Sequence, residues 1–80
     1  MPHLTINYFA VLREARGLAH EAIDSDARTP LELYSELQRK HSLSLPPSSI
    51  RVAINDEFST MNAELRDGDV IAFIAPVAGG

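Results

Sequence analysis

The chain has 80 residues, enough for one small domain and too few for a second hydrophobic core. Hydrophobic residues make up 45% of it, and no stretch reaches the roughly 20 apolar residues of a membrane span. The net charge of -4 and the scattered basic residues argue against nucleic acid as a partner. The sequence has no cysteine, which excludes disulfides, and it lacks the features of a secretory signal. We therefore expect one soluble, cytoplasmic domain that binds neither membrane nor nucleic acid.

The first predicted element is a strand over residues 4–8, where side chains alternate between two faces. One face would carry Leu4, Ile6 and Tyr8, and the other Thr5, Asn7 and Phe9. Residues 10–16 are rich in helix formers and end at Gly17, which predicts a short helical turn. Residues 18–24 predict a second strand that ends in a polar cluster.

The strongest local signal is a helix start at Thr29-Pro30. Thr29 is a good N-cap, Pro30 suits the first helical position, and Glu32 is placed to return a hydrogen bond to the cap. The helix should run to about His41. Its buried stripe would be Pro30, Leu33, Tyr34 and Leu37, with Glu32, Glu36, Arg39 and Lys40 facing solvent.

A loop and three strand segments are expected after this helix. Residues 42–49 contain Pro46-Pro47 and predict a loop. A strand follows in which Ile50, Val52 and Ile54 alternate with Arg51, Ala53 and Asn55, and Asp56-Glu57 predicts a turn into a short paired segment around Phe58. After a second turn at residues 65–69, residues 70–75 predict the last strand.

This order of strands and one long helix predicts an α+β roll in which the helix packs on one face of a mixed sheet. The helix would cover Leu4, Ile6, Tyr8, Ile71 and Phe73. The other sheet face would then hold Phe9, Val70, Ala72 and Ile74, together with Ala53. An open apolar face invites a partner. The alternative is that Phe9 folds under the helical turn that follows it.

The sequence contains no convincing catalytic or metal site. His20-Glu21 resembles half of a zinc motif, but position 24, where the second histidine would stand, is Asp24. There is no glycine-rich phosphate loop, nucleophile motif or carboxylate pair, so any ATP chemistry would belong to a partner. We expect no bound cofactor or metal.

Three arginines have two open interpretations. Arg13, Arg51 and Arg66 are candidates for contacts with acidic groups on a partner. The commoner interpretation is that each is a solvated surface side chain.

The chain ends in Gly79-Gly80, half of the four glycines it contains. With glycine near 7% of average usage, such a pair arises by chance with a probability of roughly 0.5%. Glycine lacks a Cβ atom and turns freely, which suits a chain end that must enter a narrow active site. Residues 76–80 would span about 16 Å when extended. The plain alternative is a frayed end.

Two separated segments resemble the ThiS/MoaD sulfur carriers. One is Tyr8–Glu14, and the other runs from Leu65–Asp69 to Pro76–Gly80. Within that family the chain looks most like the small subunits of molybdopterin synthase. The resemblance implies a ubiquitin-like β-grasp domain over residues 1–75 and a protruding, flexible diglycine tail over residues 76–80.

The resemblance also implies a chemistry for the tail. A separate adenylyltransferase, similar to ubiquitin-activating enzymes, would use ATP to activate Gly80. Gly79, which has no side chain, would form the narrow segment that leads to Gly80. A sulfurtransferase would supply the sulfur of a Gly80 thiocarboxylate. The large catalytic subunit of a heterotetramer would then take that sulfur for the pterin precursor of the molybdenum cofactor. The residues expected to contact this partner are Phe9, Ile74, Pro76, Val77 and Ala78.

Three alternatives are left open by the sequence. The carrier could serve another product, such as thiamine, a thiolated tRNA base or an amino acid. It could instead be a ubiquitin-like modifier attached to lysines. It could also be a β-grasp interaction module whose tail is inert.

Overall fold

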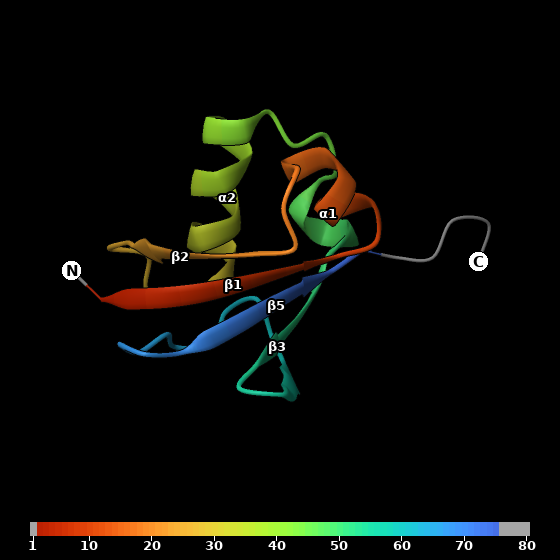
Figure 1. The fold of residues 1–80 in the computed structure, drawn as a ribbon. Helices are drawn as coiled ribbons and strands as arrows, with labels where there is room; N and C mark the ends of the chain where they lie inside the picture. The colour runs from red at the N-terminus through yellow and green to blue at the C-terminus, as the bar shows by residue number, and fades with distance from the viewer. Residues whose placement is uncertain (1, 76–80) are drawn as a thin grey trace.

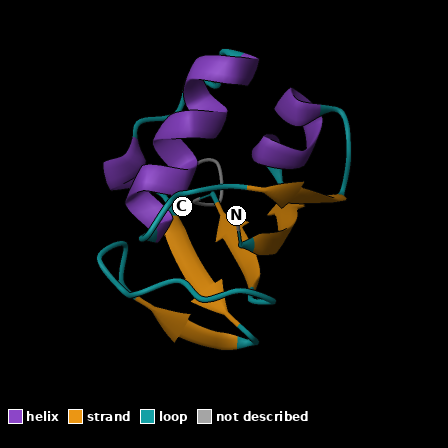
Figure 2. Ribbon diagram, turned by 90° about the vertical axis from the view of Figure 1, so that its left-hand side faces the viewer, coloured by secondary structure: helices purple, strands orange, loops and turns teal. Residues whose placement is uncertain are grey.

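Five strands form one mixed sheet, and both α-helices lie over the same face of it (Figures 1 and 2). The computed structural model describes residues 2–75. In chain order the elements are β1 (His3–Phe9), α1 (Val11–Arg16), β2 (His20–Asp24), α2 (Pro30–His41), the 3-10 helix η1 (Pro47–Ser49), β3 (Arg51–Ile54), β4 (Glu57–Ser59) and β5 (Val70–Ile74). The predicted α+β fold with one main helix on a mixed sheet is confirmed.

The strand order is β2-β1-β5-β3-β4. The first and last strands, β1 and β5, run parallel at the centre of the sheet, and the other neighbours are antiparallel. Parallel strands need a long crossover connection, and here α2 lies on that connection and covers the sheet. Of the segments that carry the family resemblance, Tyr8–Glu14 begins on the central strand β1, and Leu65–Asp69 leads into its parallel neighbour β5.

The core follows the predicted alternation. Tyr8, Phe73 and Val52 occupy matching positions on β1, β5 and β3, and all are buried. The ring of Phe73 meets that of Tyr34 on α2 edge to face, with centroids 5.4 Å apart. The inward-facing set predicted from the sequence is confirmed: Leu4, Ile6, Tyr8, Ile71 and Phe73 are buried, as are Pro30, Leu33, Tyr34 and Leu37 on α2.

Helix α2 begins where the sequence predicts, with one change in its cap. The Thr29 hydroxyl accepts a hydrogen bond from the Glu32 amide at 3.2 Å. The Glu32 carboxylate accepts from the amide of Arg28 at 3.2 Å, one residue before the predicted target. Glu36 was predicted to face solvent, but it is half-buried because it accepts a hydrogen bond from the buried hydroxyl of Ser25 at 2.9 Å. This bond ties the helix to the loop before it.

The short helix α1 is also confirmed, and it ends at Gly17. That residue has a φ of 82°, which glycine adopts without strain, and its amide donates to the carbonyl of Arg13. The predicted second strand is shorter than expected, because β2 begins at His20 and residues 18–19 belong to the connection. The amide of Tyr8 still donates to the carbonyl of Ala19, at 2.8 Å.

The turn between β3 and β4 is shifted by one residue from the prediction. Its central residues are Asn55 and Asp56, both with positive φ (52° and 71°), so that Ile54 pairs with Glu57. Asparagine and aspartate tolerate this backbone region, and two-residue hairpin turns require it. The predicted loop over residues 42–49 contains the 3-10 helix η1, and β5 ends at Ile74, one residue earlier than expected.

Candidate functional site

The sheet face opposite the helices is apolar and largely uncovered by the described residues. It is built from two rows of side chains that cross the sheet. In one row Phe9, Ile74 and Arg51 lie on neighbouring strands, and in the other Asn7, Ala72, Ala53 and Phe58 do. Phe9 is 47% exposed, so it does not fold under α1 as the alternative interpretation held. We call this surface the open face and count Val70 within it.

Phe58 is a member of the open face that the sequence analysis did not assign to it. It pairs with Ala53 and is 76% exposed, more than any other large hydrophobic residue among those described. Its assignment depends on the turn at Asn55-Asp56, since a shift of one residue moves a side chain to the other face. Asparagine and aspartate both tolerate positive φ, so the pair Asn55-Asp56 was the sequence signal for this turn and hence for the position of Phe58.

The end of β5 brings two of the predicted docking residues, Phe9 and Ile74, together at one corner of the sheet. Ile74 pairs with Phe9 and with Arg51, and the next residue, Ala75, is buried. The remaining predicted site residues, Pro76, Val77, Ala78, Gly79 and Gly80, lie outside the described residues. Figure 1 shows that β5 ends beside the start of α1. The chain thus leaves the sheet at the edge of the open face.

Ala10 joins β1 to α1 at this corner in a strained conformation. Its φ of 54° and ψ of -132° lie in a region that residues with a Cβ atom rarely adopt. Such a residue costs roughly 1–3 kcal/mol and persists only when its surroundings hold it in place. Its carbonyl accepts from the amides of Arg13 and Glu14, at 3.1 and 3.4 Å, in the first turn of α1.

Three side chains from β1, α1 and β2 meet in a cluster that we call the clamp: Tyr8, Arg16 and Glu21. The Tyr8 hydroxyl donates to Glu21 Oε2 at 2.5 Å. Arg16 donates from Nε to Oε2 and from Nη2 to Oε1, both at 2.9 Å. From the sequence, Glu21 is assigned to the second strand and to an incomplete zinc motif, and to no cluster with Tyr8 and Arg16.

The clamp is partly shielded from water, which strengthens its hydrogen bonds. The side chains of Arg16 and Glu21 are 20% and 16% exposed. Burial, followed by the neighbouring carboxylate, raises the pKa of the Tyr8 phenol, so it stays protonated and donates. Burial opposes ionisation of Glu21, but the hydrogen bonds from Arg16 and Tyr8 outweigh it and the pKa of this carboxyl lies below its usual value.

The second family motif, residues 65–69, has a structural role. One oxygen of the Asp69 carboxylate accepts from the amide of Arg66 at 2.8 Å, and the other accepts from the side chain of Asn55 at 2.9 Å. The side-chain oxygen of Asn55 also accepts a hydrogen bond from the amide of Val70. The Asp67 carboxylate accepts from the amide of His3. The motif therefore anchors the start of β5 to β1 and β3.

The three candidate arginines are all exposed, and none forms an ion pair with another of residues 2–75. Arg51 lies on the open face, beside Ile74. Arg13 lies on α1, and Arg66 belongs to the turn before β5. The structure thus leaves all three available to a partner and assigns contact to none.

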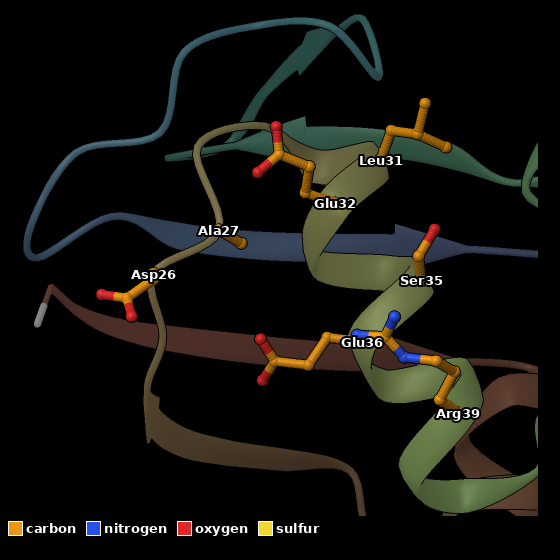
Figure 3. Close-up of a pocket in the computed structure, with 7 residues that line it drawn as sticks. All are labelled: Asp26, Ala27, Leu31, Glu32, Ser35, Glu36 and Arg39. Carbon is orange, nitrogen blue, oxygen red and sulfur yellow. The ribbon is translucent and has the colours of Figure 1, made fainter.

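A surface depression lies beside α2, away from the open face (Figure 3). Its lining residues are Asp26 and Ala27 from the loop, with Leu31, Glu32, Ser35, Glu36 and Arg39 from the helix. Glu32 and Glu36 already accept hydrogen bonds from Arg28 and Ser25. The carboxylates of Glu32 and Glu36 therefore serve the fold.

The described residues hold neither a metal-binding cluster nor a helix that could span a membrane. Within 2–75 no three histidine, cysteine or carboxylate residues are grouped closely enough to bind a metal ion. No helix in this part of the chain has both the length and the apolarity to cross a bilayer.

The sheet order, the helices on one face and the apolar second face define a small ubiquitin-like β-grasp domain. Residues 6–80 match the model of the ThiS family, and the chain belongs to this family. The resemblance found in the sequence is thereby confirmed.

Three known proteins are similar to this chain. The molybdopterin synthase sulfur carrier subunit of Haemophilus influenzae is 31% identical over 80 residues, covering 96% of this chain and 99% of the relative. A complex of subunits 1 and 2 of the molybdopterin-converting factor from Helicobacter pylori contains a chain 29% identical, with a TM-score of 0.65 and coverage of 98% and 99%. Small archaeal modifier protein 1 of Haloferax volcanii has a TM-score of 0.78 at 24% identity, with coverage of 96% and 100%, and shares the fold.

Proposed function

We propose that the chain is the sulfur-carrier subunit of a molybdopterin synthase. Whole-length similarity to a curated carrier subunit of that enzyme supports this, as does similarity to a chain from a two-subunit molybdopterin-converting complex. The observation that best supports this proposal is the open face, which reaches the end of β5, where the terminal segment begins. A carrier needs both a docking surface and a reactive end beside it. The absence of cysteine suits a reduced compartment, and we place the protein in the cytoplasm.

The proposed chemistry begins at the carboxylate of Gly80. A carboxylate oxygen attacks the α-phosphorus of ATP in an adenylyltransferase, which forms an acyl-adenylate and releases pyrophosphate. A sulfide equivalent from a sulfurtransferase then attacks the acyl carbon, and AMP leaves with the bonding electron pair. The product is a thiocarboxylate at Gly80. This chain supplies the reacting end and contributes no catalytic side chain.

The sulfur is then delivered to a pterin precursor in the large catalytic subunit. The open face would bind that subunit through Phe9, Ile74 and Phe58. Pro76, Val77 and Ala78 would line the entrance to the active site, and Gly79 would pass through its narrowest part. Five residues reach about 16 Å when extended, enough to separate a docking surface from a buried reaction centre. Two carriers in a heterotetramer would serve its two large subunits.

Intact-mass spectrometry tests the proposed function. The chain is incubated with ATP, a molybdopterin-type adenylyltransferase and a sulfur source. We expect a mass gain equal to the difference between sulfur and oxygen, located at Gly80 by fragmentation. A variant lacking Gly79-Gly80 is the control and should gain nothing. The modified chain, mixed with the large subunit and the pterin precursor, should yield the dithiolene.

Other results would redirect the assignment. A thiocarboxylate that forms but gives no dithiolene would identify a carrier for another product. Lysine adducts through Gly80 would support a protein modifier instead. No modification of Gly80 under any of these conditions would contradict the carrier function itself.

A further inference from the structure

The clamp closes a ring around the corner that carries Phe9. The ring runs along the backbone from Tyr8 through Ala10 and α1 to Arg16, and returns to Tyr8 through the carboxylate of Glu21. Two hydrogen bonds from the guanidinium of Arg16 and one from the phenol of Tyr8, all to the Glu21 carboxylate, close the ring. Because bidentate pairs fix orientation as well as distance, the end of α1 has little freedom relative to β1 and β2.

A strained residue, Ala10, lies inside this ring. Ala10 follows Phe9 directly, and its carbonyl is held by the first turn of α1. Strain of this kind is found at functional sites and is maintained by the surrounding structure. The core side of α1 supplies one anchor, the buried Leu12, and the clamp supplies the other at Arg16. Without the clamp, α1 could turn about Leu12 and Ala10 could relax.

We infer that the Tyr8–Glu21–Arg16 clamp is a positioning device that holds the corner from Phe9 to Val11 in the conformation that docks. Phe9 and Val11 are 47% and 46% exposed, so the corner offers two exposed apolar side chains, one on each side of Ala10 in the sequence, whose relative orientation depends on the Ala10 backbone. While the ring is closed, a partner that fits this arrangement binds a corner that is already ordered. When the ring is open, part of the binding free energy is spent on ordering the corner. The inference rests on the proposed function, since the partner is the large subunit.

The test compares Arg16→Gln with a matched control, Thr29→Ala. The first variant opens the clamp, and the second removes the N-cap bond of α2, which loosens the fold without touching the ring. Hydrogen exchange of the free chains is measured at the amides of Arg13 and Glu14, which donate to Ala10. Calorimetry then measures binding of each chain to the large subunit.

We expect Arg16→Gln to speed exchange at these two amides about tenfold while the amides of α2 keep their rates. Its Kd for the large subunit should rise about tenfold, or about 1.4 kcal/mol. Thr29→Ala should leave the Kd unchanged. Arg16→Lys keeps the charge but loses the bidentate geometry, so its exchange rates and its Kd should be intermediate. If Arg16→Gln does not fold, Tyr8→Phe opens the ring with the aromatic packing kept.

Three results would overturn the inference or its foundation. Unchanged exchange at Arg13 and Glu14 would show that the clamp does not hold the corner. Faster exchange with an unchanged Kd would show that the held corner is irrelevant to docking. Failure of the chain without substitutions to bind the large subunit would overturn the proposed function. The exchange data alone would then decide whether the clamp holds Ala10.

Discussion

Phe58 offers a direct test of the open face, because its side chain contributes almost nothing to the fold of the free chain. It is 76% exposed on the short edge strand β4. A phenylalanine buries roughly 200 Å² when fully covered, so about 150 Å² is available to a partner. At roughly 25 cal/mol per Å², complete covering would contribute about 4 kcal/mol, and covering half of that area about 2 kcal/mol. Phe58→Ser should therefore weaken binding to the large subunit about 30-fold.

The assay is calorimetric titration of the large subunit with the variant, beside urea unfolding of the free chain. The unfolding free energy should change by no more than about 0.5 kcal/mol, as for other exposed positions. Leu31→Ser is the matched control, since Leu31 is 39% exposed on α2, which covers the opposite sheet face. A Kd within twofold of the unmodified chain would refute the open face as the docking surface. An equal loss in Leu31→Ser would show that the effect is not specific to that face.

Three further predictions concern the corner and the clamp. Phe9→Asp should leave the thermal midpoint nearly unchanged and weaken binding of the large subunit; unchanged affinity by calorimetry would count against a role for Phe9. Because the pKa of Glu21 is lowered in the fold, its stabilising effect is present above the usual carboxyl value of about 4.3 and is lost as pH falls through the folded value. The unfolding free energies of the unmodified chain and Glu21→Gln should therefore converge in acid, and a difference independent of pH would contradict this. Ala10→Gly should raise the unfolding free energy by about 1 kcal/mol in urea titrations, since glycine tolerates positive φ, and a loss of stability would show that Ala10 is unstrained.

Features that depend on local sequence could be predicted. The start of α2 follows from Thr29-Pro30 and Glu32, whose hydrogen bonds lie within one turn. The end of α1 follows from Gly17 for the same reason. The two faces of β1 follow from strict alternation, which also placed Phe9 on the open face. In each case the deciding interaction joins residues close in the chain.

Features that depend on contacts between distant segments could not be predicted. Tyr8, Arg16 and Glu21 come from three elements, and their meeting requires the registers of β1 and β2. Ser25 belongs to the polar cluster that ends the predicted second strand, and its burial depends on the hydrogen bond to Glu36 of the distant helix α2. Phe58 was missed because a hairpin turn displaced by one residue reverses the faces of the strand that follows.

The central pairing of β1 with β5 has a consequence for synthesis on the ribosome. A nascent chain that has emerged only to Leu65 holds both helices and four of the five strands, but Ile6 and Tyr8 still lack their partners Ile71 and Phe73. One edge of β1 is unpaired at that stage, and such an edge is prone to non-native pairing. The core can close only after β5 has been made, and β5 immediately precedes the segment that ends in Gly80. A chain that stops before β5 therefore lacks both the strand that completes the core and the terminal Gly80.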